Sequence, residues 1–472
     1  MIAALALALL PAVAQSDSLT LEAFLARVRD AHPVARQAEA ARQQARADLR
    51  AARGGFDPSV SATWDYKRFK GIGYYDEVDA RLTVPTPWGV DVKVGWERAA
   101  GAIINPERKT PGTGLLSAGL SIPIGPRLLT DERRTGVRQA ELAAEAADAD
   151  ADATLVRLLQ QAARDWGAWY EADARARIAR EGVALARFRL DAVRSRVREG
   201  DVAAIDSVEA LAEWDRRVLA EIDASAALAS ARLVVSGHLG EENGAAVALA
   251  PTARPRLGAS SAADGARRVD EAQLARLARE HPSVLAARAR WLQAEAQRRL
   301  VLTQVLPSAS AEVSALGAGS SLGSLPALSE AADDAKAGVS VRIPLFARRE
   351  LGRLRAAEAR TRQLAAERDR VMREVHLAAE RAAIELAAVE AQVAGQARVL
   401  AASEVLLAAE QRRFDIGESS LLVVNLRERA VLDERHRAAQ LEARRATALG
   451  ALAAALGTPT VVTGETGEPS RR

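Results

Sequence analysis

Residues 155–200 read LVRLLQQAARDWGAWYEADARARIAREGVALARFRLDAVRSRVREG, and an apolar side chain occupies every seventh position of this stretch. These apolar positions are Leu155, Ala162, Trp169, Ala176, Val183, Leu190 and Val197. A strict seven-residue spacing keeps a stripe against a neighbouring helix only when the helices supercoil. The stretch therefore predicts a coiled-coil helix that ends at Gly200, because glycine readily adopts the left-handed conformation of a helix C-cap.

The same organisation occurs a second time in the chain. A second apolar seam comprises Met372, Ala379, Leu386, Val393, Leu400 and Leu407, and it precedes Gly417. Other residues recur at constant spacings: His32, Pro33 and Pro58 as His281, Pro282 and Pro307, and Leu239-Gly240 as Leu456-Gly457. Self-similarity of this kind indicates two tandem copies of one structural unit.

The duplication and the composition shifts predict five segments. They are a signal peptide (1–14), a first repeat (15–240), an inter-repeat linker (241–268), a second repeat (269–457) and a C-terminal tail (458–472). Each repeat should contain a short helix, a strand region and a helical hairpin, at 19–53, 56–124 and 131–239 and at 269–303, 305–346 and 350–456. The signal peptide is indicated by an apolar run followed by Ala12-Val13-Ala14. The Gly- and Pro-rich linker is expected neither to continue a helix nor to build a core.

The strand regions show apolar and polar residues in alternation. Six segments follow this pattern, four in the first repeat and two in the second, at 59–66, 77–84, 90–97, 116–124, 309–315 and 339–345. Such strands fit either a half-solvated soluble sheet or the wall of a membrane barrel. Eight of the 17 aromatic residues lie between Phe56 and Trp96, as a membrane interface favours, so the pattern favours the barrel.

Six strands are too few to close a wide barrel, and open strand edges cannot face lipid because unpaired backbone groups are costly there. Several chains must therefore share one barrel. The predicted fold class is an α+β membrane protein, with long coiled-coil helical hairpins and a transmembrane β-barrel shared between subunits. The polar faces of the strands would line a channel.

Composition argues against several other classes of protein. The 65 basic and 62 acidic residues nearly cancel, which makes nucleic acid an unexpected partner. The absence of Cys excludes disulfides and a lipidated N-terminal cysteine. The five histidines show no metal-ligand spacing, and no nucleophile elbow or phosphate loop is present. We therefore expect no catalytic residues, no cofactor and no metal site.

On these residues the chain resembles the TolC-like outer membrane efflux protein (OEP) family. The resemblance extends from Leu19 to Gly457 and rests on the tandem repeats, the His-Pro pairs, the strand pairs and the helical hairpins. It implies a homotrimer with its β-barrel in the outer-membrane lipid and an α-helical barrel in the periplasm. It also implies a periplasmic membrane-fusion adaptor and an inner-membrane pump as partners, in a tripartite efflux or type I secretion system that substrate crosses passively.

The resemblance also suggests where the adaptor binds. The predicted contacts are the two hairpin tips, with residues Gly200, Asp201, Val202, Gly417, Glu418 and Ser419. The family commonly has two strands per repeat, whereas the first repeat here has four segments. The best-known family members also carry acidic residues after the second tip, where this chain has Leu422-Val423-Val424-Asn425-Leu426. The alternative interpretation is a soluble periplasmic coiled-coil scaffold or adaptor.

Overall fold

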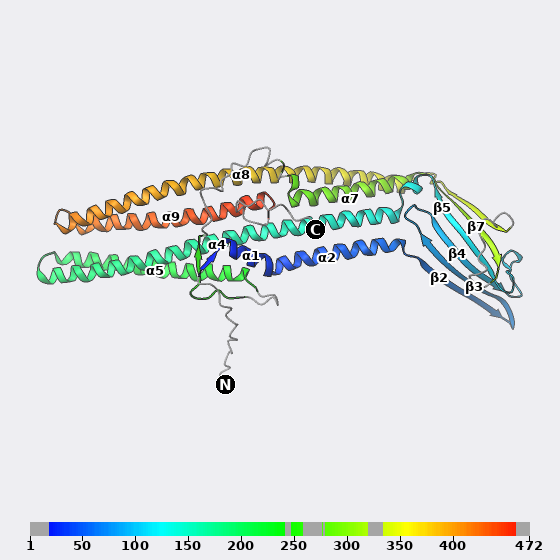
Figure 1. The fold of residues 1–472 in the computed structure, drawn as a ribbon, viewed down its shortest axis with the longest axis horizontal. Coiled ribbons are helices and arrows are strands. Elements are labelled where there is room, and N and C mark those ends of the chain that lie inside the picture. The colour runs from blue at the N-terminus through cyan, green and yellow to red at the C-terminus, as the bar shows by residue number, and fades with distance from the viewer. Residues whose placement is uncertain (1–17, 241–246, 258–275, 277–278, 320–333, 459–472) are drawn as a thin grey trace, which may run out of the picture. The chain divides into compact units, whose positions relative to one another are not determined.

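The computed structural model describes residues 18–240, 247–257, 276, 279–319 and 334–458 (Figure 1). The predicted signal peptide lies outside these residues, as do most of the predicted linker and all of the tail except Thr458. The chain forms two compact units. One contains residues 1–40, 149–284 and 371–472, and the other contains residues 41–148 and 285–370.

The described residues form long helices and one large sheet. The helices are α1 (Leu21–Ala31), α2 (Pro33–Arg53), α3 (Pro126–Leu129), α4 (Glu132–Glu199), α5 (Ala204–His238), α7 (Pro282–Val305), α8 (Arg348–Asp415) and α9 (Leu421–Ala455). The strands are β1 (Ser18–Thr20), β2 (Ser59–Phe69), β3 (Ile72–Pro85), β4 (Asp91–Ala100), β5 (Leu115–Ile124), β6 (Arg254–Arg256), β7 (Ser308–Ala318) and β8 (Ala335–Arg342). Two short 3-10 turns cover Gly54–Phe56 and Pro106–Arg108.

The two helical hairpins have the same helix lengths. Helices α4 and α8 each contain 68 residues, and helices α5 and α9 each contain 35. At 1.5 Å per residue, a 68-residue helix is about 100 Å long. The seam predicted on α4 is buried along most of its length: Ala162, Trp169 and Leu190 have no exposed surface, although Met372 at the start of the second seam is 38% exposed.

Small residues allow α4 and α9 to pack closely. A Cβ atom placed on Gly450 would lie 2.6 Å from the Cβ of Ala163, and one on Gly167 would lie 2.9 Å from the carbonyl oxygen of Ala443. Both distances are shorter than van der Waals contact. These positions require glycine because no side chain fits between the helices.

The largest core cluster lies in the first unit. Phe24 and Val28 of α1, Trp166 and Trp169 of α4, and Val235 of α5 are fully buried there.

The described part of the predicted linker adds to this cluster. Leu249 and Ala253 are buried in the same core, and β6 pairs in parallel with β1. The expectation that this stretch builds no core is therefore wrong for residues 247–257. Its apolar residues are too few and too irregularly spaced to be recognised without their partners.

The second unit contains a six-stranded antiparallel sheet in the order β2-β3-β4-β5-β7-β8. All four alternating segments of the first repeat and both segments of the second repeat are strands of this one sheet. The register preserves the alternation across all six strands. One row joins Ser59, Thr83, Lys93, Gly119, Ser314 and Lys336, and the next joins Val60, Leu82, Val94, Ala118, Ala315 and Ala335. The sheet therefore has one polar and one apolar face.

The duplicated His-Pro pairs are helix N-termini. The Nδ1 atom of His32 accepts a hydrogen bond from the N–H of Val34 over 3.1 Å, and Nδ1 of His281 accepts one from the N–H of Ser283 over 3.1 Å. The proline that follows each histidine starts the helix, where its missing N–H costs nothing. In the second repeat, Nε2 of His281 also lies 3.1 Å from the carbonyl oxygen of Ala454.

Both imidazoles must be neutral to accept these hydrogen bonds. Burial lowers the pKa of His281 below its ordinary value of 6.5, although the hydrogen bond to Ala454 opposes this effect. Burial and the neighbouring His238 lower the pKa of His32 in the same way.

Among the residues that the structure describes, no helix has both the length and the apolar character to cross a membrane.

Replacing Gly450 with Ala should destabilise the protein by about 1–3 kcal/mol, because the added methyl group overpacks the contact with Ala163. The matched control is Gly352→Ala on α8, where a Cβ atom meets nothing within 4 Å. That substitution should stabilise the helix by about 0.5–1 kcal/mol. Thermal unfolding in detergent, followed by the circular dichroism of the helices, measures the change in stability of both variants. Equal effects would contradict the close packing of α4 and α9.

We expect His281 to make the folded protein less stable as the pH falls. Its folded-state pKa is lowered, so the unfolded chain takes up the proton first and stability declines as the pH falls below about 6.5. His281→Asn keeps a capping acceptor and should reduce this decline, whereas His281→Ala should cost about 1 kcal/mol at neutral pH. Denaturant unfolding between pH 7.5 and 5, at about half-unit steps, tests this. His376→Asn, at a half-buried site on α8, should leave the decline in place.

Candidate functional site

The tip of the first hairpin is a Schellman motif. Gly200 has a φ of 83°, and its N–H donates to the carbonyl of Val197 over 3.1 Å. The N–H of Asp201 donates to the carbonyl of Arg196 over 2.9 Å. This pair of hydrogen bonds satisfies the last carbonyls of α4 and requires a left-handed residue at position 200.

The tip of the second hairpin repeats this geometry. Gly417 has a φ of 79°, its N–H donates to Phe414 over 3.0 Å, and the N–H of Glu418 donates to Arg413 over 2.9 Å. The glycines thus act as helix caps, which explains their duplication.

The remaining predicted tip residues divide into two groups. Asp201 and Glu418 are exposed, whereas Val202 and Ser419 are half-buried. The hydroxyl of Ser419 donates to the buried carboxylate of Glu410.

The two hairpins contact each other behind their tips. Leu421 at the start of α9 packs against Leu190 and Val193 of α4 and Ala210 of α5. In the stretch where related proteins were expected to carry carboxylates, Val424 and Asn425 are buried, and Leu422 and Leu426 are more than 60% exposed. The tips therefore form one packed region of the first unit.

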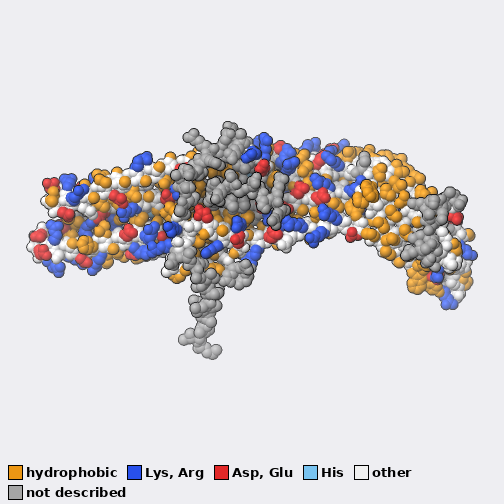
Figure 2. Space-filling model, viewed as in Figure 1, with side chains coloured by type: hydrophobic (Ala, Val, Ile, Leu, Met, Phe, Trp, Pro, Cys, Tyr) orange, Lys and Arg blue, Asp and Glu red, His pale blue; other side chains and the backbone are white. Residues whose placement is uncertain are grey.

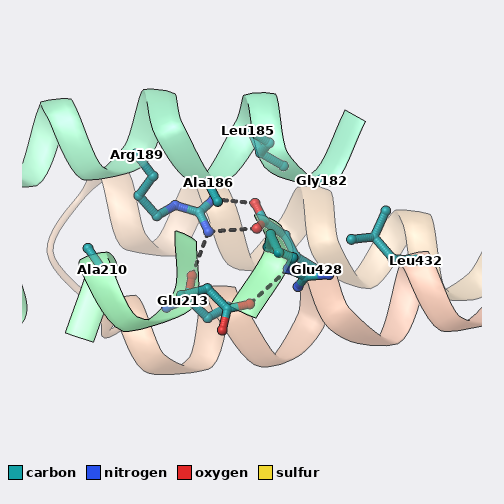
Figure 3. A pocket seen from close by; sticks show the side chains of 10 residues that line it. Gly182, Leu185, Ala186, Arg189, Ala210, Glu213, Glu428 and Leu432 are labelled. Carbon is teal, nitrogen blue, oxygen red and sulfur yellow. Dashed lines mark hydrogen bonds and ion pairs between the residues drawn. The ribbon is translucent and has the colours of Figure 1, made fainter. Parts of the chain in front are cut away.

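Arg189 of α4 joins the first hairpin to the second. Its guanidinium donates to the side-chain oxygen of Asn425 over 2.6 Å and makes a two-pronged ion pair with Glu428 of α9 (Figure 3). The side chain of Glu428 is 7% exposed, and that of Arg189 is 17% exposed. The pair is thus largely removed from water, which strengthens the attraction and makes either partner costly without the other.

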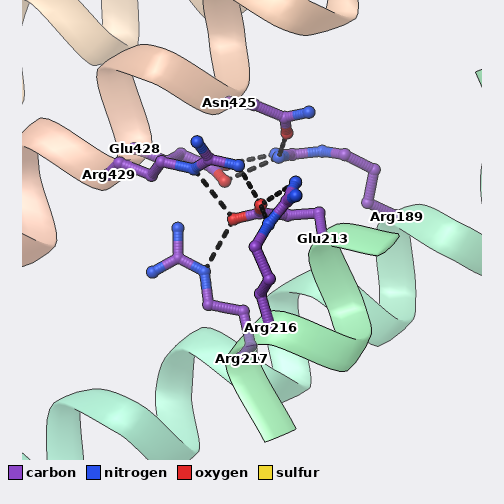
Figure 4. Close-up of polar contacts among 7 residues, drawn as sticks. All are labelled: Arg189, Glu213, Arg216, Arg217, Asn425, Glu428 and Arg429. Atoms are coloured by element: carbon purple, nitrogen blue, oxygen red, sulfur yellow. Dashed lines mark hydrogen bonds and ion pairs between the residues drawn. The ribbon is translucent and has the colours of Figure 1, made fainter. Parts of the chain in front are cut away.

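A second cluster surrounds Glu213 of α5. Arg429 of α9 donates to both carboxylate oxygens, Arg217 donates to Oε1 over 2.9 Å and Arg216 donates to Oε2 over 2.9 Å (Figure 4). Burial disfavours the charged carboxylate, but the hydrogen bonds from Arg429 and Arg216 outweigh it and hold the pKa of Glu213 below its usual value. The carboxylate therefore stays ionised at neutral pH, and it ties α5 to α9.

These two clusters were not predicted from the sequence. A spacing signal for them exists: Glu428 lies four residues after Val424 and three before Val431, both of which are buried. Glu213 likewise lies three residues after the buried Ala210. A charged residue three or four positions from buried apolar residues lies on the buried side of a coiled-coil helix. Such a residue indicates a buried partner on a facing helix.

The polar face of the sheet is the second candidate surface. It holds charges of both signs, namely Asp65, Lys67, Glu77, Asp79, Arg81, Asp91, Lys93, Glu97, Glu312, Lys336 and Arg342. Lys93 and Glu312 form an ion pair of 3.1 Å between β4 and β7. A cavity of about 240 Å³ is lined by polar-face side chains, among them Arg81, Lys93 and Glu312. Throughout the described residues, no group of three or more His, Asp or Glu side chains is arranged to hold a metal ion.

The apolar face of the sheet is exposed on its edge strands, whereas Leu116 and Ala315 on the same face are buried. Val60, Trp64 and Val339 are each more than 70% exposed, and Figure 2 shows hydrophobic side chains gathered over the sheet. Both edge strands are exposed along their whole length as well. An apolar surface of this extent marks a contact with a membrane or with other protein chains.

Solved structures with the same fold are outer-membrane channels. The outer-membrane channel OprN is 18% identical, covers 93% of this chain and 89% of its own, and has a TM-score of 0.65. VceC from Vibrio cholerae is 16% identical, with 93% and 96% covered and a TM-score of 0.64. The open state of the MtrE channel from Neisseria gonorrhoeae is 16% identical, with 94% and 91% covered and a TM-score of 0.63. No curated protein sequence matches the chain.

The fold confirms the predicted α+β class with TolC-like helical hairpins. A sequence profile describing outer membrane efflux proteins matches residues 25–241 and 274–458, which together make up most of the chain. Proteins of this family are channels rather than enzymes, and the match favours a channel over a soluble scaffold. It also places the protein in the outer membrane, with its helices extending into the periplasm. The chain is therefore a member of the outer membrane efflux protein family.

Proposed function

We propose that this protein is the outer-membrane component of a tripartite efflux or type I secretion system. It conducts substrate passively from a periplasmic pump and adaptor complex to the exterior. The observation that carries the proposal is the two-faced sheet, whose edge strands are exposed and pair with no further strand of the described residues. The family and the neighbouring structures support the channel, and the sheet supports the way in which it assembles.

The unpaired edges require further copies of the chain. Strands β2 and β8 form the two edges of the six-stranded sheet, and β3, β4, β5 and β7 lie between them. In an antiparallel sheet of six strands the first and last strands run in opposite directions, so β8 of one copy can pair with β2 of the next without breaking the alternation. A closed wall built by three copies leaves no edge facing lipid.

The polar face of the sheet then lines the conduit. Its mixture of acidic and basic side chains gives no single sign of charge along the wall. Such a lining favours a permissive water-filled pore over a selective ion filter. Energy for export must come from a partner protein.

The hairpin tips are the proposed adaptor contact and gate. Asp201 and Glu418 are exposed at the tips, where an adaptor can reach them. Separating the second hairpin from the first requires Arg189 to leave Glu428 and Arg429 to leave Glu213. Because breaking a buried ion pair costs about 3–5 kcal/mol when a charge is left unpaired, these pairs hold the two hairpins together until partners rearrange them.

Removing one carboxylate should favour the open channel. In planar lipid bilayers without nucleotide, the wild-type protein should pass a small current that reverses with the applied voltage. Glu428→Ala should raise the open fraction about tenfold or more, since each 1.4 kcal/mol lost from the link is a factor of ten.

The matched control is Glu404→Ala, which removes a carboxylate from the exposed pair with Arg435. Its conductance should equal that of the wild type. An unchanged current in Glu428→Ala would refute the gate, and the absence of any voltage-driven current in all three proteins would refute passive conduction.

A further inference from the structure

The apolar face of the sheet carries no charge toward the helices. By register, this face consists of the even-numbered residues of β2, β3, β4 and β5 and the odd-numbered residues of β7 and β8. Its only charged members in these paired strands are Asp76 and Arg98, an ion pair of 3.2 Å at the end of the face away from the helices. A charge on a lipid-facing surface is strongly unfavourable at the bilayer midplane and nearly neutral at the membrane surface. The uncharged part of the face is thus the part suited to contact lipid.

This apolar surface continues past the end of β8 toward the helices. Val339 and Val341 belong to the apolar face, and they are followed along the chain by Ile343, Leu345 and Phe346. All five side chains are more than half exposed. Figure 2 shows hydrophobic side chains gathered where the sheet meets α7 and α8. The exposed apolar surface therefore reaches the start of α8.

The first charged side chains after this apolar run are arginines. Arg348 and Arg349 begin α8, and Arg353 follows Arg349 by four residues, which places both on the same side of the helix. All three side chains are exposed. The guanidinium of Arg348 lies 5.9 Å from the ring centre of Phe346, so the cations lie directly beside the apolar run.

These three arginines are not neutralised by the described part of the chain. None of them forms an ion pair there, and the one carboxylate of this helical turn, Glu350, is half-buried and pairs with none of them. The first repeat differs at the corresponding place, the start of α4. Its arginines, Arg133 and Arg134, pair with Asp91 and Asp131 over 2.7 and 2.8 Å. The arginines of the second repeat therefore remain available for an anion from outside the chain.

We propose that the start of α8 and the apolar run before it bind phospholipids of the periplasm-facing leaflet. Arg348, Arg349 and Arg353 bind the headgroup phosphates, because a guanidinium can donate two parallel hydrogen bonds to a phosphate. Leu345 and Phe346 contact the acyl chains. The proposal rests on the proposed function, in which the apolar face of the sheet meets the bilayer. A lipid fits better than a free anion, which would leave these apolar side chains in water.

Native mass spectrometry of the intact protein in detergent tests this binding. Short-chain phosphatidylglycerol and phosphatidylcholine are titrated separately, and their dissociation constants are compared. The wild type should prefer phosphatidylglycerol, because its net negative charge complements the arginines. The variant Arg348→Gln/Arg349→Gln/Arg353→Gln should bind phosphatidylglycerol about a hundredfold more weakly, with a much smaller change for phosphatidylcholine.

Two variants serve as controls. The first removes the same charge from exposed positions further along α8, and it should bind as the wild type does: Arg360→Gln/Arg362→Gln/Arg373→Gln. The nearest of these positions lies about 16 Å beyond Arg349 along the helix, which exceeds the screening length of about 8 Å at physiological salt. The second keeps the cations and should preserve the preference, which guards against a fold defect in the glutamine variant: Arg348→Lys/Arg349→Lys/Arg353→Lys.

Several outcomes would overturn the proposal. These are unchanged phosphatidylglycerol affinity in the first glutamine variant, an equal loss in the control further along α8, or displacement of phosphatidylglycerol by inorganic phosphate at matching concentration. Loss of the oligomer rather than of the lipid in the first variant would instead assign the arginines to a contact between copies. A wild type that binds neither lipid would contradict the proposed contact of the apolar face with the bilayer. The two proposals can therefore fail separately.

Discussion

The structure depends on one constraint, which is that backbone N–H and C=O groups at a sheet edge cannot be left unpaired in lipid. The six-stranded sheet has two such edges, β2 and β8, and an exposed apolar face between them. A soluble protein would cover this face or interrupt it with charges. In the proposed assembly the bilayer covers this face, and strands of other copies pair with the edges. The proposed trimer and the polar lining of the pore both follow from this constraint.

The helical hairpins meet a different requirement, because under the proposed function they must be both rigid and able to open. Along most of the hairpins, apolar seams and close contacts such as Gly450 against Ala163 hold the helices together. Near the tips, buried arginine–carboxylate pairs take over this role. Such pairs add little net stability compared with apolar packing, but they fix one arrangement strongly and can exchange partners as a unit. This makes them suitable where a channel has to change between two states.

Periodic features could be predicted from the sequence. The heptad seam from Leu155 to Val197 predicted α4, the alternation around Trp64 predicted β2, and the duplicated Gly200 and Gly417 predicted the ends of α4 and α8. In each case the pattern is formed by residues close together in the sequence, so no distant partner is needed to recognise it. The four alternating segments of the first repeat were also read correctly as strands, and the structure joins all of them with β7 and β8 in one sheet.

Features that depend on partners distant in the sequence could not be predicted. Arg189 and Glu428 are 239 positions apart, and either residue taken alone resembles an ordinary surface charge. Leu249 and Ala253 lie in a Gly- and Pro-rich stretch whose contribution to the core becomes visible only beside α1 and α4. The role of the duplicated histidines as helix caps likewise required the Nδ1 contacts with Val34 and Ser283.

The most direct test of the central claim is the accessibility of spin labels along β3 in reconstituted membranes. The chain has no cysteine, so a single cysteine at each position from 78 to 83 carries one label. The account predicts that oxygen, which concentrates in lipid, relaxes labels at Val78, Ala80 and Leu82. A water-soluble nickel complex should instead relax labels at Asp79, Arg81 and Thr83. Equal access of the nickel complex to both sets would show that the apolar face does not contact lipid.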